Sequence, residues 1–101
     1  MELGNSIREI RKSSGLSQRS LAAKAGVAVG TIVSIEKHGV VPSRQVMNRI
    51  ATGLGVSKEY ILWYGIEERD VAPEKREAFK MLKPAMDALF SELNQEGGEK
   101  S

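Results

Sequence analysis

The stretch that most constrains the fold is residues 17 to 37, SQRSLAAKAGVAVGTIVSIEK. Its small and apolar residues recur every three or four positions in two blocks, which predicts two short helices. Gly26 lies between the blocks, where a sharp turn favours a residue that tolerates a positive φ. Two short helices that cross at a tight turn are therefore expected. Their inward positions are Leu21, Ala22, Ala25, Ile32 and Ile35.

The same periodicity predicts three more helices around this pair. Helices are expected over residues 3–13, from a cap at Ser17 to about Ala25, over residues 29–37, from Ser43 to Gly55 and from Ser57 to Gly65. Five helices with short connections make a compact all-α domain over residues 1–65. The central pair of helices is then a helix-turn-helix.

The helix over residues 29–37 has the least certain ends. Val27 and Ala28 offer no side-chain acceptor, so no strong N-cap precedes it. His38 and Gly39 stop it, and His38 is expected to end it in a left-handed conformation.

The C-terminal third reads differently. Residues 66–73 are expected to be a linker and residues 74–95 a helical segment, with a polar, disordered tail over residues 96–101. Apolar residues at alternating spacings of three and four form an a/d seam. Pro84 interrupts the run, which predicts either a kink or a break into two short helices. The seam residues are Phe79, Leu82, Met86, Leu89 and Leu93, broadened by Phe90.

Composition excludes several kinds of site. The 101 residues contain no cysteine and one histidine, so we expect no disulfide, metal site or cofactor. We find no nucleophile–base pair or phosphate loop, so an enzyme has almost no support. No apolar run is long enough to span a bilayer, and the N-terminus lacks the apolar core of a signal peptide. A soluble cytoplasmic protein without membrane contact is expected.

Charge is unevenly distributed along the chain. Residues 1–66 hold nine Lys/Arg against four acids, whereas residues 67–101 hold six against nine. The helix-turn-helix lies in the basic part, which favours an anionic partner, although a mild positive balance is also compatible with an ordinary solvated surface.

Residues 3–65 resemble the phage repressor and Cro-like (XRE-type) helix-turn-helix DNA-binding domains. The resemblance rests on IREIRKSSGLSQRSLAAKAGV, TIVSIEKHG, PSRQVMNRIATGLGVS and YIL, in this order and spacing. It implies a five-helix lambda-repressor-like fold, double-stranded DNA as partner, and a prokaryotic or phage regulator of transcription.

The resemblance also implies roles for individual residues. Gln18 corresponds to a residue that contacts a DNA phosphate, and Arg11 and Glu36 to an ion pair that positions the third helix. The third helix would enter the major groove. The base-reading candidates are Val29, Gly30, Thr31, Val33, Ser34 and Lys37, and further phosphate candidates are Arg19, Lys24, His38, Arg44 and Arg49. Each of these charges has solvation as its ordinary alternative.

The chain departs from the better-known members at the start of this third helix. Those members often carry Gln, Asn, Ser or Arg, which form bidentate hydrogen bonds to base edges. Val29 and Gly30 cannot do so through their side chains. This departure weakens the expectation of strong direct readout and leaves the fold untouched.

Two functions remain open at this stage. The first is a sequence-specific regulator, a repressor that binds a two-fold operator as a homodimer through the C-terminal seam. The second is a protein-interaction module of the antitoxin or anti-repressor type, which keeps the helix-turn-helix as a scaffold and binds a partner protein through the C-terminal helix. As an alternative to dimerisation, the C-terminal helical segment could fold back and pack its seam on its own domain.

Overall fold

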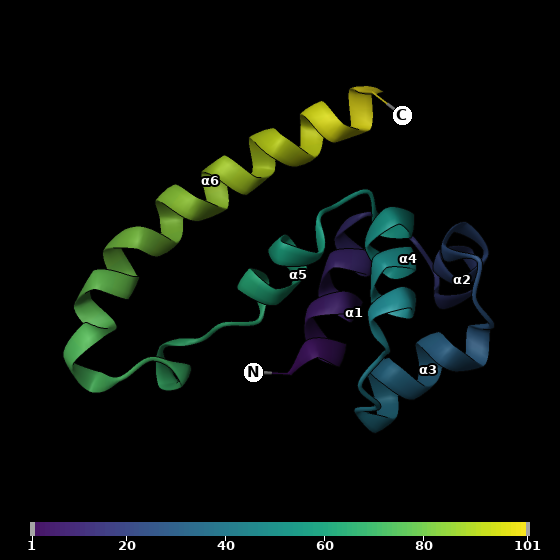
Figure 1. Ribbon diagram of the computed structural model, residues 1–101, viewed down its shortest axis with the longest axis horizontal. Coiled ribbons are helices and arrows are strands. Elements are labelled where there is room, and N and C mark those ends of the chain that lie inside the picture. Colours follow the sequence, from purple (N-terminus) through teal and green to yellow (C-terminus); the bar gives the residue numbers. More distant parts are fainter. Residues whose placement is uncertain (1, 101) are drawn as a thin grey trace. The chain divides into compact units, whose positions relative to one another are not determined.

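The computed structural model of the chain describes the backbone of residues 2–100 and the side chains of residues 2–93. It divides into two units, Glu2–Gly65 and the residues from 66 onward. Over the described residues the chain forms helices and no strand, so the all-α prediction is confirmed. The first unit contains α1 (Leu3–Ser13), α2 (Gln18–Ala25), α3 (Val29–His38), α4 (Arg44–Leu54) and α5 (Lys58–Tyr64) (Figure 1).

Three serines begin helices as predicted. The hydroxyl of Ser17 accepts a hydrogen bond from the backbone N–H of Ser20 at 2.9 Å. Ser43 and Ser57 cap α4 and α5 in the same way, by accepting from the third residue of each helix. Each hydroxyl satisfies one of the N–H groups that the first turn of a helix leaves unpaired. The predicted boundaries of these helices are confirmed.

The end of α3 differs from the prediction. His38 does not adopt a left-handed conformation; it completes the last turn of α3, and Gly39 caps the helix with a φ of 68°. Glycine takes this conformation without the steric cost that a Cβ imposes, so the reversal moves to Gly39. The backbone N–H of Val40 then donates to the carbonyl of Ser34 at 3.2 Å.

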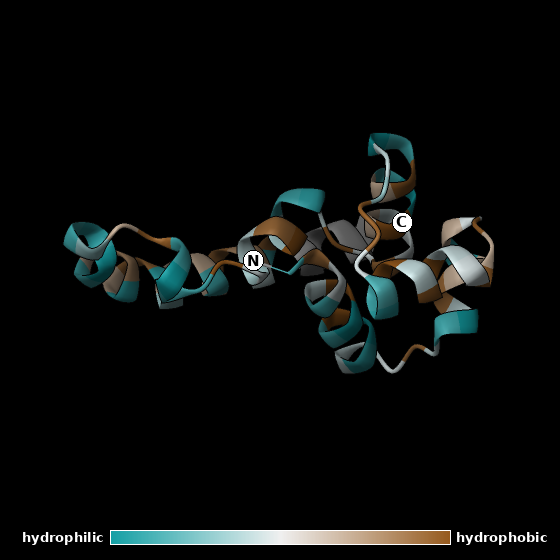
Figure 2. Cartoon of the chain, turned by 90° about the horizontal axis from the view of Figure 1, so that it is seen from below, coloured by the Kyte–Doolittle hydropathy of each residue, from teal (hydrophilic) through white to brown (hydrophobic). Residues whose placement is uncertain are grey.

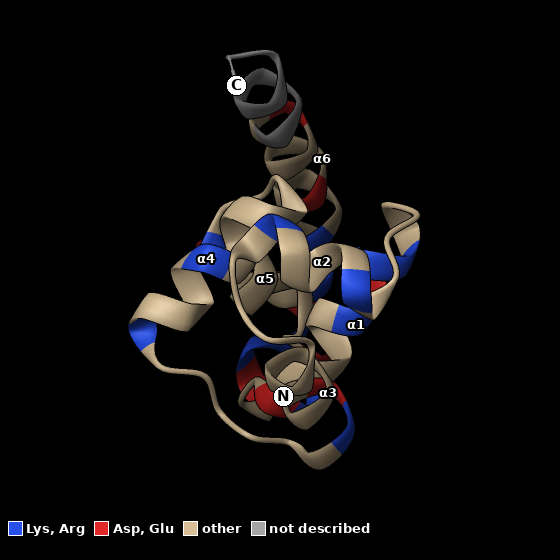
Figure 3. Cartoon of the chain, turned by 90° about the vertical axis from the view of Figure 1, so that its right-hand side faces the viewer, with Lys and Arg blue, Asp and Glu red and all other residues tan. Residues whose placement is uncertain are grey.

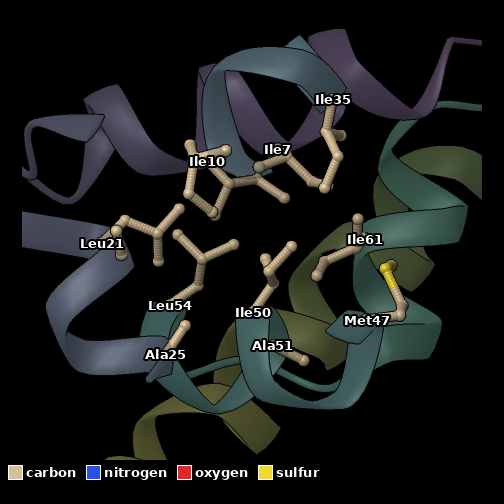
Figure 4. Close-up of a cluster of buried hydrophobic side chains, with 12 residues drawn as sticks. Ile7, Ile10, Leu21, Ala25, Ile35, Met47, Ile50, Ala51, Leu54 and Ile61 are labelled. Carbon is tan, nitrogen blue, oxygen red and sulfur yellow. The ribbon is translucent and has the colours of Figure 1, made fainter. Parts of the chain in front are cut away.

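The first unit is held by one apolar core to which all five helices contribute. Side chains of α1, α2, α3, α4 and α5 point toward one another in Figure 4. α2 packs on α3 and α4, α1 packs on α3 and α5, and α4 packs on α5. Hydrophobic and hydrophilic residues alternate along the helices, as amphipathic packing requires (Figure 2). The fully buried members are Ile7, Leu21, Ile32, Ile35, Ile50 and Ile61.

The second unit consists of two short 3₁₀ turns, Glu68–Asp70 and Pro73–Lys75, followed by α6 (Arg76–Lys100). Pro84 lies inside α6, so of the two predicted alternatives, a kink or a break into two helices, the structure excludes the break. A proline removes one hydrogen bond, while the turns on either side keep theirs. An ion pair between Lys83 and Asp87, 3.5 Å long, spans this point.

α6 also extends beyond residue 95. Its backbone is helical as far as Lys100, which differs from the disordered tail expected over residues 96–101. Adding a residue to an existing helix costs far less than nucleating one, which favours continuation of α6 even though Gly97 and Gly98 are poor helix formers. Ser101 lies outside the described residues. Within the part of the chain that the structure describes, no helix has the length and apolarity that crossing a bilayer requires.

Candidate nucleic-acid interface

A buried ion pair joins α1 to α3. Arg11 donates from Nε to Oε2 of Glu36 at 2.8 Å and from Nη2 to Oε1 at 2.9 Å. Its Nη1 donates to the carbonyl of Leu16 at 2.8 Å. The two side chains are only 9% and 2% exposed. The pair expected between these residues is therefore present, in the bidentate geometry that suits a guanidinium and a carboxylate.

Gln18 extends this pair to α2. Its Nε2 donates to Oε1 of Glu36 at 3.2 Å, so Glu36 accepts hydrogen bonds from two other helices. One N–H of Nε2 stays outside this contact, because a side-chain amide carries two. Gln18 is thus half-buried and partly engaged inside the protein, whereas the resemblance implies a contact with DNA alone.

The Glu36 hydrogen bond raises the pKa of the Arg11 guanidinium above its usual value, and burial opposes the shift. A folded-state pKa above the unfolded value stabilises the fold at every pH below the ordinary pKa of an arginine. The contribution is lost only when the pH rises above that value. Arg11 therefore remains charged throughout the range in which the protein is handled.

The outer face of α3 carries the base-reading candidates. Val29 is 41% exposed, and Gly30 and Lys37 are also exposed. Thr31, Val33 and Ser34 are half-buried. A Cβ built on Gly30 would meet no atom within 4 Å, so the surface over this residue is open. These residues lie together on α3, and all except Val29 border one of two different hollows.

The first hollow, which we call the basic hollow, opens between α1, the start of α2 and α3. Val33 and Lys37 line it from α3. Its remaining lining residues are Arg8, Arg11, Lys12, Gln18 and Glu36. Four of the seven side chains are cationic, and the charge of Arg11 is balanced by Glu36.

The second hollow, which we call the apolar hollow, lies between α3 and the connection to α4. Gly30, Thr31 and Ser34 border it from α3. The opposite side is formed by Val40, Val41 and Pro42, and Val41 is 80% exposed. Exposed valines offer apolar contacts and no side-chain hydrogen bonds.

The predicted phosphate contacts lie within the helix-turn-helix and on α4. Figure 3 shows Lys and Arg in blue on α4, and also on α1, where no phosphate contact was predicted. Arg49 is partly engaged, because its Nη1 donates to the carbonyl of Gly26 at 3.3 Å. The other candidates, all exposed, are His38 and the cationic residues Arg19, Lys24 and Arg44.

Two groups of residues escaped the sequence analysis. Arg8 and Lys12 belong to α1, outside the helix-turn-helix, and neither was among the predicted site residues. Their spacing of four residues puts them on one face with Arg11, which is the signal that could have identified them. Val40 and Val41 belong to the connection between α3 and α4, and nothing in their order predicts that they border the same hollow as α3.

The seam of α6 is partly exposed. Leu82, Leu89 and Leu93 are about half exposed, at 50%, 48% and 51%. Phe79, Met86 and Phe90 are half-buried. In the heptad that these residues define, Pro84 falls at position f, on the face opposite the seam. The ring of Pro84 therefore leaves the seam uninterrupted.

Comparisons with known proteins agree with this geometry. A family model described as helix-turn-helix matches residues 7–61, which cover α2, α3 and α4 and parts of α1 and α5. An "uncharacterized HTH-type transcriptional regulator" of Methanothermobacter thermautotrophicus is 47% identical over 49 residues, which are 48% of this chain and 71% of the relative. The comparison with solved structures found no match. The chain belongs to the XRE-type helix-turn-helix family of DNA-binding transcriptional regulators.

Proposed function

We propose that the protein is a repressor that binds a two-fold operator in double-stranded DNA as a homodimer, with α3 in the major groove. The observation that carries this proposal is the position of α3. Its outer face is open to solvent, while its C-terminal end is fixed to α1 and α2 through Glu36. A recognition helix must combine an accessible face with a rigid mounting, because base contacts depend on its register in the groove.

Base readout in this proposal is mainly apolar. Val29 packs on a thymine methyl, and Gly30 allows the backbone of α3 to approach the base edges closely. Thr31, Ser34 and Lys37 supply the polar contacts. Thr31 and Ser34 border the apolar hollow, so their hydroxyls reach bases only toward that side of α3. We expect modest sequence discrimination from α3.

Affinity then depends on contacts to the phosphates. Gln18, at the start of α2, lines the basic hollow, and the second N–H of its Nε2 would donate to a phosphate there. Each cation that neutralises a phosphate releases counterions, so such contacts make binding strongly dependent on salt. The cationic contacts in the proposal are Arg19, Lys24, Arg44 and Arg49, and His38 adds a hydrogen-bond donor.

Dimerisation through α6 completes the proposal. Three half-exposed leucines on one seam are unfavourable in water, and a second copy of α6 would bury them. Two copies of α3 would then read half-sites about 10 base pairs apart, or a multiple of that distance.

The decisive experiment is a titration of duplex DNA at several salt concentrations. We expect a binding constant that falls steeply with salt, with a slope equivalent to several phosphates. Selection of bound fragments from random duplex DNA would then reveal a two-fold consensus. A protein with no measurable DNA affinity at low salt would refute the proposal.

One observation favours a second function. The apolar hollow and the exposed Val41 resemble a protein-binding surface more than a base-reading one, because neither offers hydrogen bonds. A protein-interaction module would use this surface or the seam of α6 to bind a partner protein. Tight binding of a partner together with absent DNA affinity would favour this function over the first.

A further inference from the structure

We propose that the basic hollow is a binding site for a phosphate of the DNA backbone, formed by Arg8 and Lys12 of α1 and Lys37 of α3. This inference rests on the proposed DNA binding and adds α1 to the part of the protein that contacts DNA. None of the residues on α1 that face the hollow belongs to the helix-turn-helix itself.

The charge balance of the hollow leaves three cations available. Glu36 is its one acidic lining residue, and its carboxylate already accepts from Arg11 and Gln18. Among the side chains of residues 2–93, no acid forms an ion pair with Arg8, Lys12 or Lys37. All three are exposed, so their charged ends can meet a ligand without rearrangement of the core.

The arrangement of these cations favours an anion. Arg8 and Lys12 are one helical turn apart on α1, and like charges at this spacing repel each other. Lys37 approaches the same hollow from α3 and adds to the repulsion. A phosphate between them would replace repulsion with attraction on all three sides. Arg11 also lines the hollow, but three of its five N–H groups are already used and Glu36 balances its charge.

The position of the hollow identifies the anion as part of DNA. Val33 and Lys37 of α3 form one of its walls. The major groove is about 12 Å wide and a helix with its side chains is 10–12 Å across, so α3 in the groove has a phosphate strand along each flank. The basic hollow lies on one flank of α3 and the apolar hollow on the other. A strand that borders the groove therefore passes the basic hollow.

A free phosphate ion fits the hollow less well. The cations are exposed and belong to long side chains, so one small ion would pay much of its binding energy to order them. DNA presents successive phosphates, and its affinity gains from the counterions that each contact releases.

The test compares full-length variants by fluorescence anisotropy with one duplex of fixed sequence at several salt concentrations. Arg8→Gln and Lys12→Gln remove one charge each, and Arg8→Lys and Lys12→Arg keep it. Lys58→Gln is the matched control, because Lys58 is exposed on α5 and lines neither hollow. Exposed substitutions of this kind leave stability within about 0.5 kcal/mol, which thermal unfolding checks.

Each lost contact should lower the magnitude of the salt slope by about 0.9 and weaken binding about eightfold at 0.1 M salt, equally for unrelated DNA sequences. Lys58→Gln should change the slope much less, and the charge-keeping variants should bind like the wild type. Slopes for Arg8→Gln and Lys12→Gln that match Lys58→Gln, with wild-type binding intact, would overturn the site and leave the proposed function standing.

Two other outcomes would also overturn the site. Wild-type protein without DNA affinity at low salt would remove both the proposed function and this inference. Inorganic phosphate at millimolar concentration that shifts the α1 resonances in wild type but not in a variant carrying both Arg8→Gln and Lys12→Gln, with DNA slopes unchanged in the single variants, would assign the hollow to a free anion.

Discussion

The ion pair between Arg11 and Glu36 should contribute both to the stability of the fold and to the placement of α3, and substitutions can measure the two contributions separately. Glu36→Leu would leave the guanidinium of Arg11 buried with only the carbonyl of Leu16 as partner. Removing one partner of a buried pair costs about 3–5 kcal/mol. Since 1 kcal/mol corresponds to about 4–8 °C in a domain of this size, the loss should lower the melting temperature by at least about 12 °C.

Arg11→Met should cost a similar amount, because the Glu36 carboxylate would keep only Gln18 as a donor. The double variant removes both charges together. Replacing a whole buried pair with apolar side chains is often neutral, but the carbonyl of Leu16 and the amide of Gln18 would each lose a partner, at about 1 kcal/mol apiece. We expect the double variant to be about 2 kcal/mol less stable than wild type.

Urea unfolding followed by circular dichroism measures all four free energies of unfolding. The two single losses should exceed the double loss by several kcal/mol, which is the coupling between the side chains. Additive single losses, with coupling below about 1 kcal/mol, would refute the reasoning that the pair is buried and mutually dependent.

The double variant also tests positioning. Under conditions in which it is fully folded, it should bind DNA more weakly than wild type, because Glu36 no longer ties the end of α3 to α1 and α2. Equal affinity would mean that the pair contributes to stability alone.

Further substitutions test other parts of the structure. Gly30→Ala should stabilise the protein by about 1 kcal/mol, because a helical glycine with open space above it costs entropy. The same substitution should weaken DNA binding if the backbone of α3 approaches the bases at this residue. Unchanged DNA affinity would exclude that approach. Gly4→Ala should destabilise by about 1–3 kcal/mol in chemical unfolding, because its Cβ would press on the backbone of Ile35 and lie 3.3 Å from the Cα of Glu36. Leu89→Asp should convert a dimer into a monomer in sedimentation, whereas Met81→Asp, at an 80% exposed position off the seam, should not; a Leu89→Asp variant that sediments as wild type would argue against pairing of α6.

The fold of residues 2–65 was largely predictable because its determinants are local. Serine caps, helical periodicity and the glycines that follow α2 and α4 each act within a few residues. The error at His38 has a local origin as well, since two adjacent residues competed for one left-handed position and glycine takes it at lower cost. Pro84 left two predictions open, a kink or a break, because the cost of one lost hydrogen bond does not by itself decide whether the helix continues on the other side.

The candidate site was less predictable because it is assembled from distant segments. The pairing of Arg11 with Glu36 followed from a family resemblance, whereas the hydrogen bond from Gln18 to Glu36 required the relative placement of α2 and α3. The two hollows likewise arise where separate helices meet. Periodicity in one helix does not carry that information.

The missing cap at the start of α3 has a consequence for how the protein meets its ligand. Ala28 provides no side-chain hydrogen bond, and only the far end of α3 is anchored through Glu36. The amide hydrogens of the first turn of α3 should therefore exchange with solvent faster than those near Glu36. A ligand that orders this turn loses part of its binding free energy to the entropy of ordering. The amides whose exchange slows when the ligand binds would identify the residues of α3 that it orders.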